Sequence, residues 1–160
     1  MVELRPEGPE DWWEVEALFD LCFAPGREAL SSYRLRDGID PIAELCRVGR
    51  EDGVLACAIR AWPVRVGAEA AAAALVGPVA VHPTRQGEGL GAEILGELAE
   101  RGEMLGWTRL LLVGDLPYYG RFGYRTLMGV AMPPPTNPER ILGLGPWEGV
   151  TGAVARWDDG

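Results

Sequence analysis

A glycine-rich turn between a predicted strand and a predicted helix constrains this chain more than any other feature. The apolar run at residues 74–81 is typical of a strand, and Pro83 ends it by removing a ladder donor. From Gly89 the apolar residues recur at helical spacing, and the expected buried face is Leu90, Ile94, Leu95, Leu98 and Leu105. Gly106 has the position of a helix C-cap. The chain must therefore change from strand to helix over a few residues.

This turn has the chemistry of an anion-binding site. Its glycines let the backbone approach a ligand closely and adopt positive φ. The first amides of the following helix lack intrahelical acceptors and lie at the positive end of the helix dipole. The dipole contributes only ~0.3–2 kcal/mol, so several charge-assisted hydrogen bonds of ~1.5–3 kcal/mol each must supply most of the affinity. We expect a diphosphate here, because it can accept that many bonds.

Length and composition indicate one globular domain over residues 1–160. The chain is 48% hydrophobic and 24% charged, which is the balance of an ordinary globular protein. No apolar run reaches the ~20 residues that a membrane-spanning helix needs, and the first residues lack the pattern of an export signal. We therefore expect a cytoplasmic protein without a membrane partner.

Charge and residue types exclude several kinds of chemistry. The net charge of -9 opposes binding to nucleic acid, and the absence of lysine excludes any lysine-based reaction. A single histidine and three scattered cysteines provide no metal-ligand set. We expect Cys22, Cys46 and Cys57 to be reduced core residues, and His82 to orient the loop that follows it. The acidity favours a cationic substrate or serves only solubility.

The rest of the pattern indicates a mixed α/β (α+β) protein. Asp11 is expected to cap a helix whose buried face is formed by Trp13, Ala17 and Leu21 with Leu18 and Cys22. This helix is expected to end at Pro25–Gly26. A second short helix is expected around residues 28–35, and another from Pro117. The expected strands lie at residues 2–5, 42–48, 54–63, 74–81, 110–113, 124–128 and 150–157, and those at 42–48 and 54–63 form a hairpin.

Two sequence elements resemble the GNAT superfamily of N-acetyltransferases. The family signature, Gln/Arg-x-x-Gly-x-Gly/Ala after a strand that ends Val-x-Pro, is matched by Gln86, Gly89 and Gly91 after residues 81–83. A second family element, Phe-Tyr-x-x-x-Gly-Phe, is matched at residues 118–124. The tail, at residues 133–139 and 149–154, is similar to a bacterial subgroup of GNAT enzymes. The resemblance implies the GNAT fold, a mixed and mostly antiparallel sheet of about six to seven strands flanked by helices.

The resemblance also implies a reaction and a set of site residues. The chain would transfer an acetyl group from acetyl-CoA to a primary amine of a small molecule or peptide by direct attack, as a monomer or homodimer. A bulged strand that splays from its neighbour would bind pantetheine and the thioester, and the turn would bind the pyrophosphate. The implied cofactor-binding residues are Val79, Ala80, Val81, Gln86, Gly87, Glu88, Gly89, Leu90 and Gly91. Tyr119 would assist departure of the CoA sulfur, and Asp115 is a weak candidate for the base.

Other interpretations of these residues remain open. The turn also fits Gly-x-Gly-x-x-Ala at Gly87, Gly89 and Ala92, a dinucleotide fingerprint, but residues 82–86 separate it from its strand. A purely structural turn is a further alternative. The fold could also serve a non-catalytic module that binds or senses acyl-CoA. The acceptor is not readable from the sequence, and we expect residues 23–40 and 132–147 to build its pocket.

Overall fold

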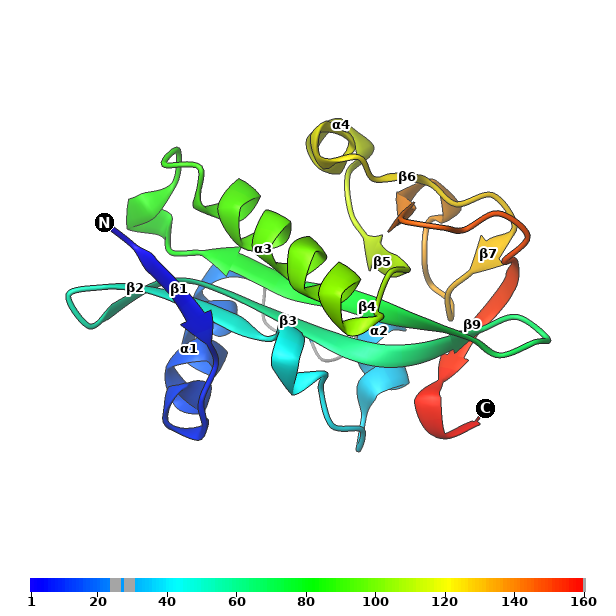
Figure 1. The fold of residues 1–160 in the computed structure, drawn as a ribbon, viewed down its shortest axis with the longest axis horizontal. Helices are drawn as coiled ribbons and strands as arrows, with labels where there is room; N and C mark the ends of the chain where they lie inside the picture. The colour runs from blue at the N-terminus through cyan, green and yellow to red at the C-terminus, as the bar shows by residue number, and fades with distance from the viewer. Residues whose placement is uncertain (24–26, 28–30, 160) are drawn as a thin grey trace.

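The computed structural model describes residues 1–23, 27 and 31–159, and its central feature is one twisted sheet (Figure 1). The strands in the described residues are β1 Glu3–Pro6, β2 Arg47–Glu51, β3 Val54–Val66, β4 Ala71–Val81, β5 Leu110–Val113, β6 Arg125–Thr126, β7 Val130–Ala131, β8 Ile141–Leu144 and β9 Gly152–Arg156. Their order is β1-β2-β3-β4-β5-β8-β6, and β9 pairs with β3 and β7. The pairs β4–β5 and β7–β9 are parallel and the others antiparallel. The mixed, mostly antiparallel sheet is confirmed.

Helices cover both faces of the sheet. Helices α1 Trp12–Cys22 and α2 Ser31–Arg36 lie on one face, and α3 Leu90–Leu105 and α4 Leu116–Tyr119 lie on the other (Figure 1). Helix α3 buries four of the five predicted apolar residues, whereas Leu105 is 46% exposed, and Gly106 forms the predicted C-cap. No helix in the described part of the chain is long and apolar enough to cross a membrane.

The buried face of α1 differs from the prediction. Val15, Leu18 and Phe19 are buried, whereas Trp13 is 80% exposed and Leu21 is 58% exposed. Apolar residues occur all around this helix, so its periodicity does not select one face, and packing against Ala58 and Ala80 of the sheet decides it. The predicted end at Pro25–Gly26 lies outside the described residues, and α1 ends at Cys22.

Asp11 precedes α1 as predicted, but its side chain makes no capping hydrogen bond to that helix. Its carboxylate accepts a hydrogen bond from the Gly8 N–H at 2.8 Å and pairs with Arg5 and Arg50, each at 2.9 Å. Arg5 lies in β1 and Arg50 in β2. Burial raises the pKa of Asp11, but the two arginines and the Gly8 N–H lower it to about 2. Asp11 therefore links the start of α1 to the sheet edge.

The strand predicted at residues 42–48 is shorter in the structure. Ala43–Leu45 forms a 3-10 turn, and β2 begins at Arg47. The turn is held because the Ile42 N–H donates to the Ala61 carbonyl, which lies in β3. The predicted hairpin with β3 is confirmed. Strands β7 and β8 were not predicted, and β6 covers only part of residues 124–128.

A bulge interrupts the pairing of β3 with β4. Ile59 pairs with Val79 and Ala61 with Val76, so Gly77 and Pro78 together oppose the single residue Arg60. Ile59 and Ala61 pack on the α3 side of the sheet. Arg60 therefore points to the other side, where its guanidinium lies 3.8 Å from the ring centre of Trp12 in α1.

Arg60 is fully buried and ion-paired. It donates two hydrogen bonds to the Glu7 carboxylate, at 2.9 and 3.1 Å, and it also pairs with Glu16 of α1. These two carboxylates raise the pKa of Arg60 against the effect of desolvation. The cluster fixes α1 to the sheet directly beneath the bulge.

Removing one member of this cluster should be costly. We expect Glu7→Ala to lower the free energy of unfolding by about 3 kcal/mol, because it leaves a buried guanidinium with less compensation. Glu3→Ala changes the same residue type on the exposed side of β1 and should stay within about 0.5 kcal/mol of the parent. Urea denaturation measures both. Equal stability of the two variants would contradict a stabilising role for the Arg60 cluster.

Candidate functional site

The glycine-rich turn presents a row of unpaired backbone amides at the start of α3. Gly87 and Gly89 have φ values of 84° and 80°, a conformation that disfavours other residues. The first bond into the helix runs from the Glu93 N–H to the Gly89 carbonyl at 3.1 Å. Among the described residues, none accepts a hydrogen bond from the N–H groups of residues 86–92. The amides expected to form an anion site are therefore available to a ligand.

Side chains next to the turn fix its shape. His82 Nδ1 lies 3.2 Å from the Thr84 backbone nitrogen and 2.8 Å from its hydroxyl oxygen, so His82 contacts the loop that follows β4. Arg85 pairs with Glu51 at 2.8 Å, which ties the turn to the β2–β3 hairpin. Arg85 also pairs with Glu88 at 2.9 Å and lowers the pKa of that carboxyl. This pairing neutralises the one carboxylate within the turn.

The strand before the turn is open along one edge. β4 pairs with β5 only at Ala74 and Leu75, so β5 does not cover its second half. The His82 N–H donates to the Ala56 carbonyl of β3 at 2.8 Å. Because antiparallel ladder bonds alternate, Ala80 also bonds toward β3, and the peptide groups of Val79 and Val81 face the open edge. The bulge and the splayed strand implied by the sequence are both present.

The Val81 carbonyl is already occupied. It accepts a hydrogen bond from Gln86 Nε2 at 2.9 Å and lies 3.4 Å from Cys22 Sγ. Gln86 therefore closes the turn back onto β4, in addition to presenting its own amide. Leu90 contributes only its backbone to the open surface, because its side chain is 4% exposed and belongs to the core beneath α3.

Two tyrosine rings of α4, Tyr118 and Tyr119, lie close to Gly91 and Gly114. Tyr119 is partly buried against the core, with its ring over the backbone of Gly114, and burial raises its pKa. Tyr118 contacts the Tyr119 ring edge-on at a centroid distance of 4.9 Å. A Cβ placed at Gly91 would lie 2.6 Å from the Tyr118 hydroxyl, which therefore reaches the first turn of α3. The sequence analysis overlooked Tyr118, although the tyrosine pair at 118–119 was a signal.

Asp115 lies outside this cluster. Its side chain is 73% exposed and pairs with Arg140 at 3.2 Å. Asp115 borders a mainly apolar cavity of about 1100 Å³, which lies between α4 and residues 126–130 and 137–140. The described residues contain no cluster of His, Cys, Asp and Glu suited to a metal ion. Cys46 and Cys57 are buried free thiols, and Cys22 is a partly buried one.

The open edge of β4 and the glycine-rich start of α3 together suit an extended ligand that carries amide and phosphate groups. The chain belongs to the GNAT acetyltransferases, because the acetyltransferase (GNAT) domain family matches residues 3–127. A comparison with curated proteins gave no match.

Solved structures share the whole architecture. A GNAT family N-acetyltransferase (YhbS) from Escherichia coli, in complex with CoA, is 24% identical and has a TM-score of 0.84, covering 98% of this chain and 90% of that one. A GNAT family acetyltransferase from Brucella melitensis, in complex with acetyl-CoA, is 26% identical with a TM-score of 0.72, covering 97% of this chain and 95% of that one. The ribosomal-protein-S18-alanine N-acetyltransferase from Escherichia coli is 19% identical with a TM-score of 0.65, covering 91% and 94%.

Tyr124, next to Tyr119, gives a test of this aromatic cluster. It is 4% exposed, and its hydroxyl has no hydrogen-bond partner in the described residues. We expect Tyr124→Phe to raise the free energy of unfolding by about 1 kcal/mol, since it removes an unsatisfied buried group. Tyr33→Phe is the matched control and should lose about 1 kcal/mol, because the Tyr33 hydroxyl accepts from Arg27 at 2.6 Å.

The pH dependence follows from the same burial, which raises the pKa of Tyr124 and of Tyr119. The unfolded tyrosines lose their protons first, near pH ~10, so stability should fall as the pH rises above that value. Tyr124→Phe should fall less steeply than the parent in urea titrations at pH 9–11. A loss of stability in this variant at neutral pH would show that the hydroxyl has a partner.

Proposed function

We propose that this chain transfers the acetyl group of acetyl-CoA to a primary amine of a small molecule or peptide. The observation that carries the proposal is the row of unpaired N–H groups at residues 86–92. These groups suit a pyrophosphate, which can accept several charge-assisted bonds at a helix N-terminus. Membership in the GNAT family and the acetyl-CoA complex of the Brucella relative support the same cofactor.

The open edge of β4 suits the acyl arm of that cofactor. Val79 follows the bulge directly and directs its peptide groups into the gap left by β5. An N–H fixed at this position can hydrogen-bond the thioester carbonyl and stabilise the negative charge that develops during attack. Pantetheine amides can pair with the same edge as an added strand does. The Ala80 backbone is committed to β3, so Val79 and Val81 are the better candidates.

Tyr119 suits the departing sulfur through a hydrogen bond. Burial raises its pKa, so it is a neutral donor at pH 7. Full proton transfer from a phenol near pKa ~10 to a thiolate near ~8.5 is uphill by ~2 kcal/mol even before this increase. A hydrogen bond that strengthens as charge develops on sulfur avoids that cost. Tyr118, whose hydroxyl reaches Gly91, suits contact with the bound cofactor instead.

The acceptor amine must be deprotonated before it attacks. An amine of pKa ~10.4 pays ~4–5 kcal/mol to become neutral at pH 7. Asp115 stays a candidate for the base, although its side chain is exposed and already pairs with Arg140. A route through water in the open gap suits the structure equally well.

We further propose that residues 1–160 act as one GNAT domain. The family match ends at residue 127, yet β8 and β9 lie beyond it and pair with β5 and β3 of the same sheet. The last residues therefore complete the sheet rather than forming a separate unit. A cytoplasmic location and a homodimeric assembly stay predictions from the sequence.

Thiol release on mixing acetyl-CoA with a panel of amines tests the activity. We expect Tyr119→Phe to lower kcat at least tenfold with little change in acetyl-CoA affinity, since its bond forms in the transition state. Tyr118→Phe removes the same group from the neighbouring residue and should alter KM for acetyl-CoA more than kcat. Cofactor binding without thiol release across the panel would favour the acyl-CoA sensor instead.

The amide cradle has a matched pair of glycine variants. Gly89 and Gly53 have φ values of 80° and 79°, and a Cβ at either position meets nothing within 4 Å. Alanine should therefore cost each about 1–2 kcal/mol of stability through the same backbone strain. Only Gly89→Ala should also weaken acetyl-CoA binding by tenfold or more in calorimetry, because only Gly89 lies in the turn. Unchanged binding by Gly89→Ala would remove the basis for the cradle.

A further inference from the structure

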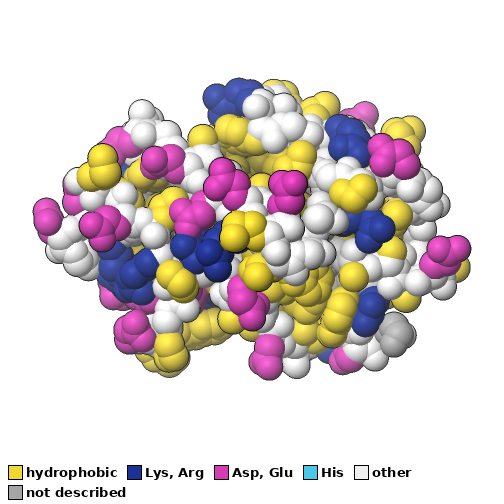
Figure 2. All heavy atoms as spheres, in the orientation of Figure 1, with side chains coloured by type: hydrophobic (Ala, Val, Ile, Leu, Met, Phe, Trp, Pro, Cys, Tyr) yellow, Lys and Arg dark blue, Asp and Glu magenta, His cyan; other side chains and the backbone are white. Residues whose placement is uncertain are grey.

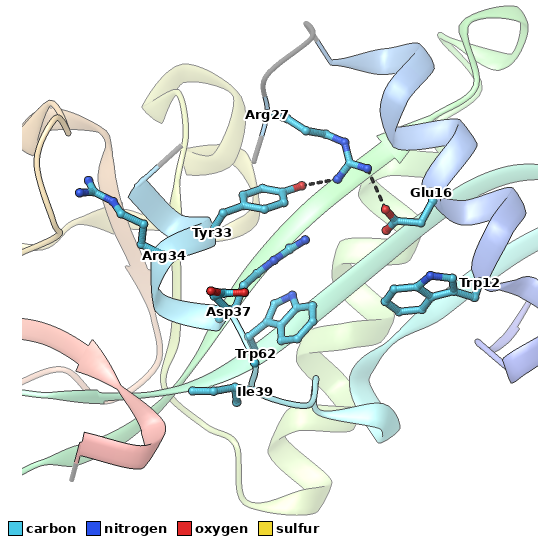
Figure 3. Close-up of a pocket in the computed structure, with 10 residues that line it drawn as sticks. Trp12, Glu16, Arg27, Tyr33, Arg34, Asp37, Ile39 and Trp62 are labelled. Carbon is cyan, nitrogen blue, oxygen red and sulfur yellow. Dashed lines mark hydrogen bonds and ion pairs between the residues drawn. The ribbon is translucent and has the colours of Figure 1, made fainter. Parts of the chain in front are cut away.

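The pocket between α1 and α2 lies on the sheet face opposite the glycine-rich turn. It has a volume of about 510 Å³, and its walls include Trp12 and Glu16 of α1, Tyr33 and Arg36 of α2, and Trp62 of β3 (Figure 3). Trp62 follows Arg60 on the same face of β3, two residues from the point opposite the bulge. The pocket therefore borders the part of the sheet where β4 opens toward the thioester.

Arg36 is held between two aromatic rings of this pocket. Its guanidinium carbon lies 3.6 Å from the ring centre of Tyr33 and 4.5 Å from that of Trp62. Within the described residues, the guanidinium donates no hydrogen bond and pairs with no carboxylate. Burial lowers the pKa of Arg36, the opposite of the shift at ion-paired Arg60. The rings fix the position of the charge, but its donors are unused.

Trp62 provides a second unused donor at the same place. Its side chain is 6% exposed, and its indole N–H is buried without an acceptor among the described residues. Burying an indole N–H without an acceptor costs about 1–3 kcal/mol, so native proteins rarely leave such a group unpaired. The wall made by Arg36 and Trp62 is therefore rich in donors and poor in acceptors.

The carboxylates of the pocket do not satisfy Arg36. Glu16 already pairs with Arg27 at 2.9 Å and with Arg60, as Figure 3 shows for Arg27. Asp37 is exposed and forms no ion pair with any described residue. An amine substrate that carries its own oxyanion would supply the missing partner of Arg36. Asp37 would remain free to attract the ammonium group of that substrate.

From these contacts we infer that Arg36 binds an oxyanion, a carboxylate or a phosphate monoester, on the amine that this enzyme acetylates. The planar guanidinium can pair with two oxygens of such a group at once while the rings hold its faces. Arg36 would thereby select acceptors that carry a negative group near the amine. This inference rests on the proposed acetyl transfer, because that reaction makes the bound amine a substrate. Binding of the oxyanion itself does not depend on turnover.

Pairs of amine substrates with and without an anionic group test whether Arg36 selects for the anion. L-amino acids are compared with their amides, and O-phosphoethanolamine with ethanolamine, by the ratio of kcat/KM values for thiol release within each pair. We expect the better of the two anionic classes to exceed its neutral partner at least tenfold, the range of a charged hydrogen bond. The two arms distinguish a carboxylate from a phosphate. Amine basicity cancels when the same ratio is compared between variants.

Variants of two neighbouring arginines identify the residue responsible. Arg36→Gln should bring the ratio near one, and Arg36→Lys should restore part of it, since lysine keeps the charge but not the planar fork. Arg34→Gln removes the same charge from the same helix and should leave the ratio unchanged. The Arg34 side chain donates to the Pro134 carbonyl and points away from the pocket centre (Figure 3).

Ligand-induced shifts in Tm without acetyl-CoA separate the two proposals. A shift with the anionic amines that is lost in Arg36→Gln supports the oxyanion site even if no thiol is released, in which case acetyl transfer alone fails. Thiol release at equal rates from anionic and neutral partners overturns the oxyanion site and leaves acetyl transfer intact. Equal ratios in the parent and Arg36→Gln, or no shift dependent on Arg36, also overturn it.

Discussion

The site depends on one constraint, namely that β4 has a paired neighbour on both edges only at Ala74 and Leu75. Every strand residue carries a donor and an acceptor that require partners. Beyond Leu75 the outer edge of β4 must therefore be satisfied by water or by a ligand, except at the Val81 carbonyl, which accepts from Gln86 Nε2. The turn to α3 starts at the end of this edge, so the unpaired amides of the helix continue the same surface. A ligand with amide and phosphate groups can match both parts.

The bulge connects the two faces of the sheet. It places two residues of β4 opposite Arg60, which the carboxylates of Glu7 and Glu16 hold on the α1 side. The cofactor elements lie on the α3 side, while the pocket with Arg36 lies on the α1–α2 side. An acceptor and a thioester that approach from opposite faces can meet only where β4 and β5 separate. The proposed direct attack of a bound amine on the thioester carbonyl would take place at this opening.

Local patterns allowed the glycine-rich turn and helix α3 to be predicted. The turn, the start of α3 at Leu90 and its C-cap at Gly106 follow from residue types whose backbone preferences are strong. The face of α1 was predicted wrongly because its apolar residues surround the helix, and tertiary packing made the choice. Asp11 was assigned to a cap, but Arg5 and Arg50, which are distant in sequence, took its carboxylate instead.

The pocket around Arg36 could not be predicted from the sequence because its contacts join distant segments. Arg36 and Tyr33 belong to α2, but Trp62 comes from the middle of β3, and no spacing rule relates them. Residues 33, 34 and 36–39 line the pocket around Arg36, whereas residues 137–140 line the separate cavity beside Asp115, and which of the two holds the amine stays a prediction. Strand β8 escaped prediction because Gly143 interrupts its short apolar run, and an interior glycine disfavours a strand.

A protein of net charge -9 would be expected to repel both an anionic cofactor and an anionic acceptor. Figure 2 shows acidic and basic side chains interspersed on the viewed face, so the excess carboxylates are not gathered into one acidic patch there. At physiological salt the Debye length is about 8 Å, and exposed carboxylates farther away than that have little effect. Within that distance, Arg85 neutralises Glu88 in the turn, and Glu16 is occupied by two arginines. The proposed recognition of anions would therefore depend on the unpaired amides and on Arg36, which pairs with no carboxylate among the described residues.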